Sequence, residues 1–83
     1  MKVYVRFFAS CREAAGTEVM ELELPQDCDI EEVVKEVIRK YPHAKEVMES
    51  TALAKNLEYV PKGESVKLKE GDEIAFIPPV SGG

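Results

Sequence analysis

Residues 29–41 read DIEEVVKEVIRKY, and this stretch decides the fold of the chain. Its apolar side chains recur at spacings of three and four residues, which places them on one stripe of an α-helix. The stripe consists of Ile30, Val33, Val34, Val37, Ile38 and Tyr41. Asp29 stands at the N-cap position, Glu32 completes a capping-box pattern, and Pro42 ends the helix at Tyr41. We therefore expect one helix over residues 29–41, with its apolar stripe buried.

Two strands are predicted before this helix. Residues 2–8 and residues 18–24 both alternate between apolar and polar side chains, which is typical of strands with one buried face. The inner faces are formed by Val3, Val5 and Phe7 in the first strand and by Met20, Leu22 and Leu24 in the second. Residues 9–15 between them favour a short helix that ends at Gly16, a frequent C-cap residue.

Shorter elements are predicted after the helix. Residues 43–50 favour a second short helix, with Val47 as its best apolar anchor. Residues 51–60 contain short strand-like pieces, and residues 73–77 are a convincing last strand. The two prolines that follow cannot donate hydrogen bonds to a neighbouring strand, so pairing ends there.

The order is strand, strand, helix, short strands, strand. One amphipathic helix with a single face to bury needs a sheet to cover. We therefore expect an α+β fold of the ubiquitin-like β-grasp type, with a mixed sheet of four to five strands packed on one main helix and short extra helices. The first and last strands should be central and adjacent. Residues 1–77 would form this domain, and residues 78–83 an extended tail.

Composition limits the classes of partner. The 83 residues are 45% hydrophobic and 33% charged, which is typical of one small globular domain, and the formal net charge is -5. We expect no nucleic-acid partner, because phosphate binding needs a basic stripe. We expect no membrane span, since no apolar run approaches ~20 residues. Cys11 and Cys28 lack metal-site spacing and follow no signal peptide, so we expect reduced thiols, no bound metal and a cytoplasmic protein.

The last three residues, Ser81, Gly82 and Gly83, suggest a function for the end of the chain. Glycine has no Cβ, so a Gly-Gly segment can pass through a tunnel too narrow for other residues. The carboxylate of Gly83 is then unhindered, and a partner enzyme could activate it with ATP as an acyl-adenylate. The other interpretation is a frayed end.

Strand alternation also predicts an apolar patch near the tail. If Phe7 and Phe76 point to the helix, Phe8 and Ile77 point to the opposite face and should be exposed in the isolated chain. Together with the residues that follow, Pro78, Pro79 and Val80, they would form a surface of the kind that marks interfaces. The alternative is a small satellite cluster that closes the edge of the core.

Three segments resemble the MoaD family, the small subunits of molybdopterin synthase. Residues 71–83, GDEIAFIPPVSGG, are similar to the family's C-terminal signature. Residues 5–9, VRFFA, resemble its first strand, and residues 56–60, NLEYV, its central segment with an asparagine. The chain departs from the family at Lys55 and Cys11, where aliphatic residues are common.

The resemblance implies a sulfur carrier for molybdopterin, the organic part of the molybdenum cofactor. A MoeB-like adenylyltransferase would use ATP to adenylate Gly83, which follows Gly82, and a sulfurtransferase would convert the adenylate to a thiocarboxylate. A MoaE-like large subunit would take up the tail in a heterotetrameric synthase, and the sulfur would pass to a pterin precursor. The carrier would bind no cofactor itself. Its partner-binding residues would be Phe8, Ile77, Pro78, Pro79, Val80 and Ser81.

No complete active site is expected in the chain, which would make it the non-catalytic subunit of a sulfurtransferase. His43 is the only histidine, and it stands at a helix boundary, where an exposed or capping role is expected. Other functions stay open: a carrier for thiamine, tungstopterin or tRNA thiolation, a ubiquitin-like modifier joined to lysines through Gly83, or an interaction module with an inert tail.

Overall fold

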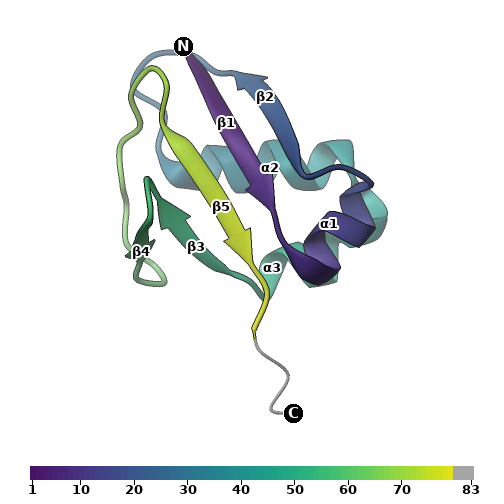
Figure 1. Ribbon diagram of the computed structural model, residues 1–83. Helices are drawn as coiled ribbons and strands as arrows, with labels where there is room; N and C mark the ends of the chain where they lie inside the picture. The colour runs from purple at the N-terminus through teal and green to yellow at the C-terminus, as the bar shows by residue number, and fades with distance from the viewer. Residues whose placement is uncertain (80–83) are drawn as a thin grey trace.

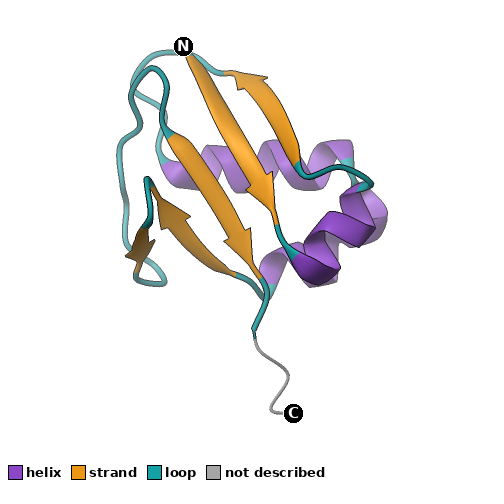
Figure 2. Cartoon of the chain, viewed as in Figure 1, coloured by secondary structure: helices purple, strands orange, loops and turns teal. Residues whose placement is uncertain are grey.

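One five-stranded sheet lies across one main helix in the computed structural model, which describes residues 1–79 (Figures 1 and 2). In chain order the elements are β1 (Lys2–Phe7), α1 (Ala9–Ala15), β2 (Val19–Glu23), α2 (Ile30–Lys40), the 3-10 turn η1 (Pro42–Ala44), α3 (Lys45–Glu49), β3 (Ala52–Lys55), β4 (Glu58–Val60) and β5 (Glu73–Ile77). The strand order is β2-β1-β5-β3-β4. The predicted β-grasp fold is confirmed.

The first and last strands form the centre of the sheet. β1 and β5 are parallel, with Val5 opposite Ile74 and Phe7 opposite Phe76. The remaining pairs are antiparallel: β2 with β1, β3 with β5, and β4 with β3. The central position of β1 and β5, predicted from the sequence, is confirmed.

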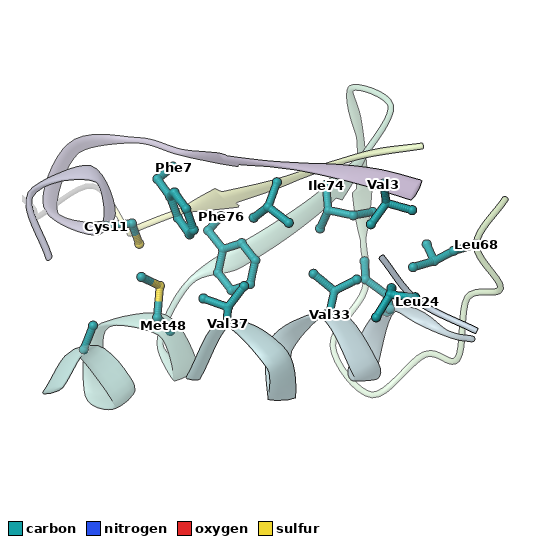
Figure 3. Close-up of a cluster of buried hydrophobic side chains, with 13 residues drawn as sticks. Val3, Phe7, Cys11, Leu24, Val33, Val37, Met48, Leu68, Ile74 and Phe76 are labelled. Carbon is teal, nitrogen blue, oxygen red and sulfur yellow. The ribbon is translucent and has the colours of Figure 1, made fainter. Parts of the chain in front are cut away.

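The core lies between this central pair and α2. Figure 3 shows Phe7, Ile74 and Phe76 pointing from the sheet toward Val33 and Val37 of the helix. The rings of Phe7 and Phe76 are 5.7 Å apart at an interplanar angle of 44°. Further buried apolar side chains close the ends of the core: Val3, Val5, Cys11, Leu24, Ile30, Ala44, Met48 and Leu68.

The helical stripe is only partly buried, which corrects the sequence-based expectation. Ile30, Val33 and Val37 are buried, but the flanking row of the stripe is half-buried. That row consists of Val34, Ile38 and Tyr41. A single helix on a sheet completely buries the row of side chains that faces the sheet directly. Side chains in the flanking row point toward the edge of the sheet and therefore stay partly exposed to solvent.

The N-terminus of α2 is stabilised differently from the predicted capping box. Asp29 has the extended backbone of an N-cap residue, but its side chain makes no capping hydrogen bond. The N–H of Ile30 donates instead to the carbonyl oxygen of Val66, at 2.9 Å. Glu32 forms an ion pair with Lys35 of the next turn, at 3.8 Å. The neighbouring 66–67 segment therefore replaces part of the cap that the sequence pattern suggested.

The second short helix is anchored by a different side chain from the predicted one. Met48 and Ala44 are each 2% exposed, whereas Val47 is half-buried. The 3-10 turn at Pro42–Ala44 comes directly before α3 and sets which side of α3 faces the core. Periodicity within residues 43–50 could not reveal this change of helix type.

A buried aspartate connects β5 to the β3–β4 hairpin. The carboxylate of Asp72 accepts hydrogen bonds from the Nδ2 of Asn56 at 2.9 Å and from the N–H of Lys69 at 2.8 Å. The Oδ1 of Asn56 accepts from the N–H of Glu73 at 2.9 Å. Lys55, which lies within β3, brings its ammonium group to 4.0 Å from Asp72. These contacts hold the hairpin turn against the start of β5.

The same contacts lower the pKa of Asp72. Burial alone would raise this pKa, but the hydrogen bonds from Asn56 and Lys69 and the positive charges of Lys55 and Lys69 stabilise the carboxylate, and the net shift is downward from 3.8. The folded state therefore favours the charged form. The stabilisation is complete above the unfolded-state pKa and is lost as pH falls through the lower, folded-state pKa.

We predict that Ile30→Ala and Ile38→Ala will differ in stability although both remove the same atoms from α2. Ile30 is 2% exposed, so its truncation should cost about 2–5 kcal/mol of unfolding free energy. Ile38 is half-buried, so its truncation should lower the unfolding free energy by less than half as much. Urea denaturation of both variants measures the difference. Equal losses would contradict the division of the stripe.

We predict that Asp72→Asn will destabilise the protein by about 1–3 kcal/mol at pH 7, because an amide cannot accept both hydrogen bonds without placing its own N–H₂ against a donor. The difference from the unsubstituted protein should shrink as pH falls below 3.8, the ordinary pKa of this carboxyl, because the unfolded chain then takes up a proton. It should vanish once pH has fallen through the lower pKa of the folded state, where the native carboxylate itself is protonated. Urea denaturation at pH 7 and pH 3 measures both values. A difference that is constant with pH would show that the charge of Asp72 does not stabilise the fold.

Candidate functional site

The chain leaves the sheet at the end of its central strand β5 (Figure 1). Pro78 is half-buried and Pro79 is exposed, and neither belongs to a strand. The sequence-based expectations for Val80, Ser81, Gly82 and Gly83 fall outside the described residues and stay predictions, as does the boundary between domain and tail.

The face of the sheet opposite α2 carries the exposed apolar side chains. Because strand residues alternate, burial of Phe7 and Phe76 sends Phe8 and Ile77 to this open face. Five large apolar side chains are exposed on this face or at its rim in the described part of the chain. They are Tyr4 (37%), Phe8 (45%), Val19 (49%), Leu57 (92%) and Tyr59 (71%).

Part of this open face is hollowed into a dish of about 220 Å³. Its apolar wall is formed by Phe8, Leu57, Tyr59 and Ile77. Its floor includes two alanines, Ala54 and Ala75, which stand opposite each other on β3 and β5. Methyl groups between larger side chains leave room, so this alternation of small and large residues creates the concavity. We call these six residues the dish.

One side of the dish is charged. Arg6 and Glu73 project from adjacent strands and form an ion pair at 3.5 Å. The side chains of Arg6 and Glu73 are 48% and 39% exposed, so water screens the attraction between their charges. At an interface this ion pair would fix the orientation of the partner, because the partner must place an acidic group near Arg6 and a basic group near Glu73.

The structure confirms the predicted exposure of one residue of the apolar patch and corrects that of another, and their role at an interface stays a prediction. Phe8 is exposed, as alternation predicts. Ile77 is half-buried instead of exposed, because β5 has a strand on each side and Ile77 stands beside Ala52 of β3. Sequence analysis missed Leu57 and Tyr59 as members of the site. The sequence placed Tyr59 in a strand-like piece without showing which face it occupies, since its neighbours Glu58 and Val60 are exposed and half-buried, and nothing in the sequence pointed to Leu57.

A second, larger groove of about 810 Å³ lies beside the dish, between the helices and the β3–β4 edge. It includes Val34 of α2, Met48 of α3 and the base of the tail at Pro78 and Pro79. The tail therefore starts between two concave surfaces. Three carboxylates, those of Glu31, Glu49 and Glu64, border this groove.

Within residues 1–79 the side chains do not form a recognisable catalytic or metal centre. No group of three His, Cys, Asp or Glu residues there could hold a metal ion. Cys11 is buried, which raises the pKa of its thiol and makes it less reactive. His43 is exposed, one of the two alternatives expected for it, and its Nε2 lies 2.8 Å from the carbonyl oxygen of Ala14, near the end of α1. None of the described helices is long and apolar enough to cross a membrane.

Comparison with known proteins agrees with the fold and the tail signature. A model of the ThiS family matches residues 5–83. The molybdopterin synthase sulfur carrier subunit of Chlamydomonas reinhardtii is 39% identical over 83 residues, which is 100% of both chains.

Two solved structures are also similar. The small archaeal modifier protein 1 of Methanosarcina acetivorans has a TM-score of 0.83 and 32% identity, covering 99% of this chain and 96% of that one. In a complex of subunits 1 and 2 of the molybdopterin-converting factor from Helicobacter pylori, one chain has a TM-score of 0.72 and 29% identity, covering 100% of both. Since the family model spans nearly the whole sequence and the β-grasp fold agrees, this chain belongs to the ThiS family, which confirms the MoaD-like resemblance.

Proposed function

We propose that this chain is the sulfur carrier subunit of a molybdopterin synthase. The observation that carries the proposal is the full-length similarity to a subunit of that name, at 39% identity. The family match also extends through Gly83, the residue on which the chemistry would depend. A domain without a catalytic centre among its described residues fits a subunit that delivers a reactive group to a partner's active site.

The chemistry takes place on the carboxylate of Gly83. A free carboxylate is a poor acyl donor, because its leaving group would be oxide. Attack of a carboxylate oxygen on the α-phosphorus of ATP, held by a MoeB-like partner, releases pyrophosphate and leaves an acyl-adenylate. The outer sulfur of a persulfide supplied by a sulfurtransferase then attacks the acyl carbon, AMP departs, and an acyl disulfide forms. A thiol that attacks the persulfide's inner sulfur breaks the S–S bond, becomes part of a disulfide, and releases the thiocarboxylate. Gly82 keeps both sides of this carbon unhindered.

A MoaE-like large subunit would dock on the dish and receive the tail. Phe8 and Ile77 provide apolar contacts, and Pro78 and Pro79 restrict the backbone at the start of the tail, so less conformational entropy is lost when it is ordered. The six residues from Pro78, which include Val80 and Ser81, can span ~20 Å when extended. That length reaches a pocket in a partner while the folded domain stays on the partner's surface.

A second function is favoured by one observation. The archaeal modifier protein from Methanosarcina acetivorans has the same fold at 32% identity. Modification of lysines would use the same adenylated Gly83, with an amine in place of the sulfur nucleophile. The two functions therefore share the activation step and differ in the product.

We predict that the intact protein will gain the mass of one oxygen-to-sulfur replacement when it is incubated with an activating enzyme, ATP and a sulfur source. Deletion of Gly83 should abolish this gain and leave the melting temperature unchanged, because β5 already ends at Ile77. Intact mass spectrometry and thermal denaturation measure the two effects. Lysine-linked conjugates in place of a thiocarboxylate would support the modifier function and contradict the carrier function.

We predict that Phe8→Ala will weaken binding to the large subunit by about 2 kcal/mol or more, because a central aromatic side chain at an interface often contributes that much. Its effect on unfolding should be about 0.5 kcal/mol, as at other exposed positions. Val19→Ala is the matched control, because Val19 is exposed to a similar extent on the same face but lies outside the dish. Titration calorimetry and urea denaturation measure both quantities. Normal binding by Phe8→Ala would show that the dish is not the interface.

A further inference from the structure

Leu57 combines two features that are unfavourable in the isolated chain. Its side chain is 92% exposed, so it contributes almost nothing to the core. Its φ angle is 74°, in the left-handed region that bulky side chains rarely adopt. Residues held in such conformations cluster at functional sites when the surrounding structure enforces them.

The β3–β4 hairpin enforces this conformation. Lys55 pairs with Glu58, which leaves a two-residue turn of Asn56 and Leu57, both with positive φ. Turns of this kind favour asparagine followed by glycine, and the first of these is present. The N–H of Asn56 donates to the carbonyl oxygen of Glu73 at 2.8 Å, in addition to the side-chain contacts with Asp72 and Glu73 described above. A leucine therefore occupies a glycine position in a turn that is firmly held.

The turn places this leucine at the wall of the dish. Leu57 lines it together with Phe8, which directly follows β1, and Tyr59, which belongs to β4. A side chain that is presented by a rigid turn loses little conformational freedom when a partner binds it, which favours affinity. No described residue of the chain covers its apolar surface, which is therefore available to a partner.

We infer that Leu57 is a specificity-determining contact that inserts into an apolar recess of the large subunit. The inference rests on the proposed function, because it assigns the partner of the same site. The large subunit is the expected occupant because a structurally similar chain was solved in complex with its subunit 2, and because Leu57 extends the apolar wall formed by Phe8. In this inference the left-handed conformation serves binding, because the turn that imposes it also directs the side chain of Leu57 toward the partner.

The test uses two substitutions that tolerate positive φ. Leu57→Gly removes the side chain and the strain, and Leu57→Asn replaces the apolar group by a small polar one in a conformation that asparagine accepts. Both proteins should melt at the same temperature as the unsubstituted chain or higher. Both should bind the large subunit of the source organism at least about fivefold more weakly in titration calorimetry. Leu57→Met, which keeps an apolar side chain, should retain most of the affinity, and Val19→Ala serves as the control outside the dish.

The outcomes separate this inference from the proposed function. Weaker binding with an unchanged or raised melting temperature supports the inference. Normal binding by Leu57→Gly, together with weakened binding by Phe8→Ala, would overturn the role of Leu57 and leave the dish as the interface. A lower melting temperature of Leu57→Gly would assign the leucine to the fold and also overturn the inference. Normal binding by both Leu57→Gly and Phe8→Ala would overturn the inference and the docking surface together.

Discussion

The structure depends on burial of the inner face of the parallel β1–β5 pair against α2. Val5, Ile74 and Phe76 are completely buried there, and full burial of each such side chain contributes about 1.5–3 kcal/mol. A few such contributions are comparable with the entire stability of a small domain. β1 begins at Lys2 and β5 ends at Ile77, so the core closes only when the first and last strands of the domain pair side by side. The tail is thereby fixed to the most firmly held strand.

This burial also determines the surface available for a partner. Strand side chains alternate between faces, so each inward residue of β1 and β5 is followed by an outward one. Phe7 is buried and Phe8 is exposed, and Phe76 is buried while Ile77 faces the dish. The packing of the core and the position of the proposed docking surface are therefore two consequences of one strand register. A shift of that register by one residue would exchange the two faces.

The carrier function requires a domain that holds its surface rigid and leaves the chemistry to its tail and its partners. The contacts of Asp72 with Asn56 and Lys69 supply rigidity beside the dish, because they fasten the β3–β4 turn to the start of the tail-bearing strand. A charge-assisted network of this kind is stronger than neutral hydrogen bonds. The same network connects stability to the proposed docking surface, since it holds the turn that carries the exposed Leu57.

The sequence alone determined the main helix, the strands β1, β2 and β5 and the tail signature, because each depends on periodicity or motifs within about a dozen neighbouring residues. The β-grasp fold was predicted from the order of these elements and from the need of one amphipathic helix for a sheet to cover. Only the tertiary structure decided that Val34 and Ile38 lie at the edge of the core and that the dish joins Phe8, Leu57 and Tyr59. Pairing between β3 and β5 brings residues from distant parts of the chain together, and local patterns carry no information about such contacts. Leucine by itself disfavours a left-handed conformation. At Leu57 this conformation depends on the pairing of Lys55 with Glu58 and on the hydrogen bond that joins Asn56 to Glu73 of β5.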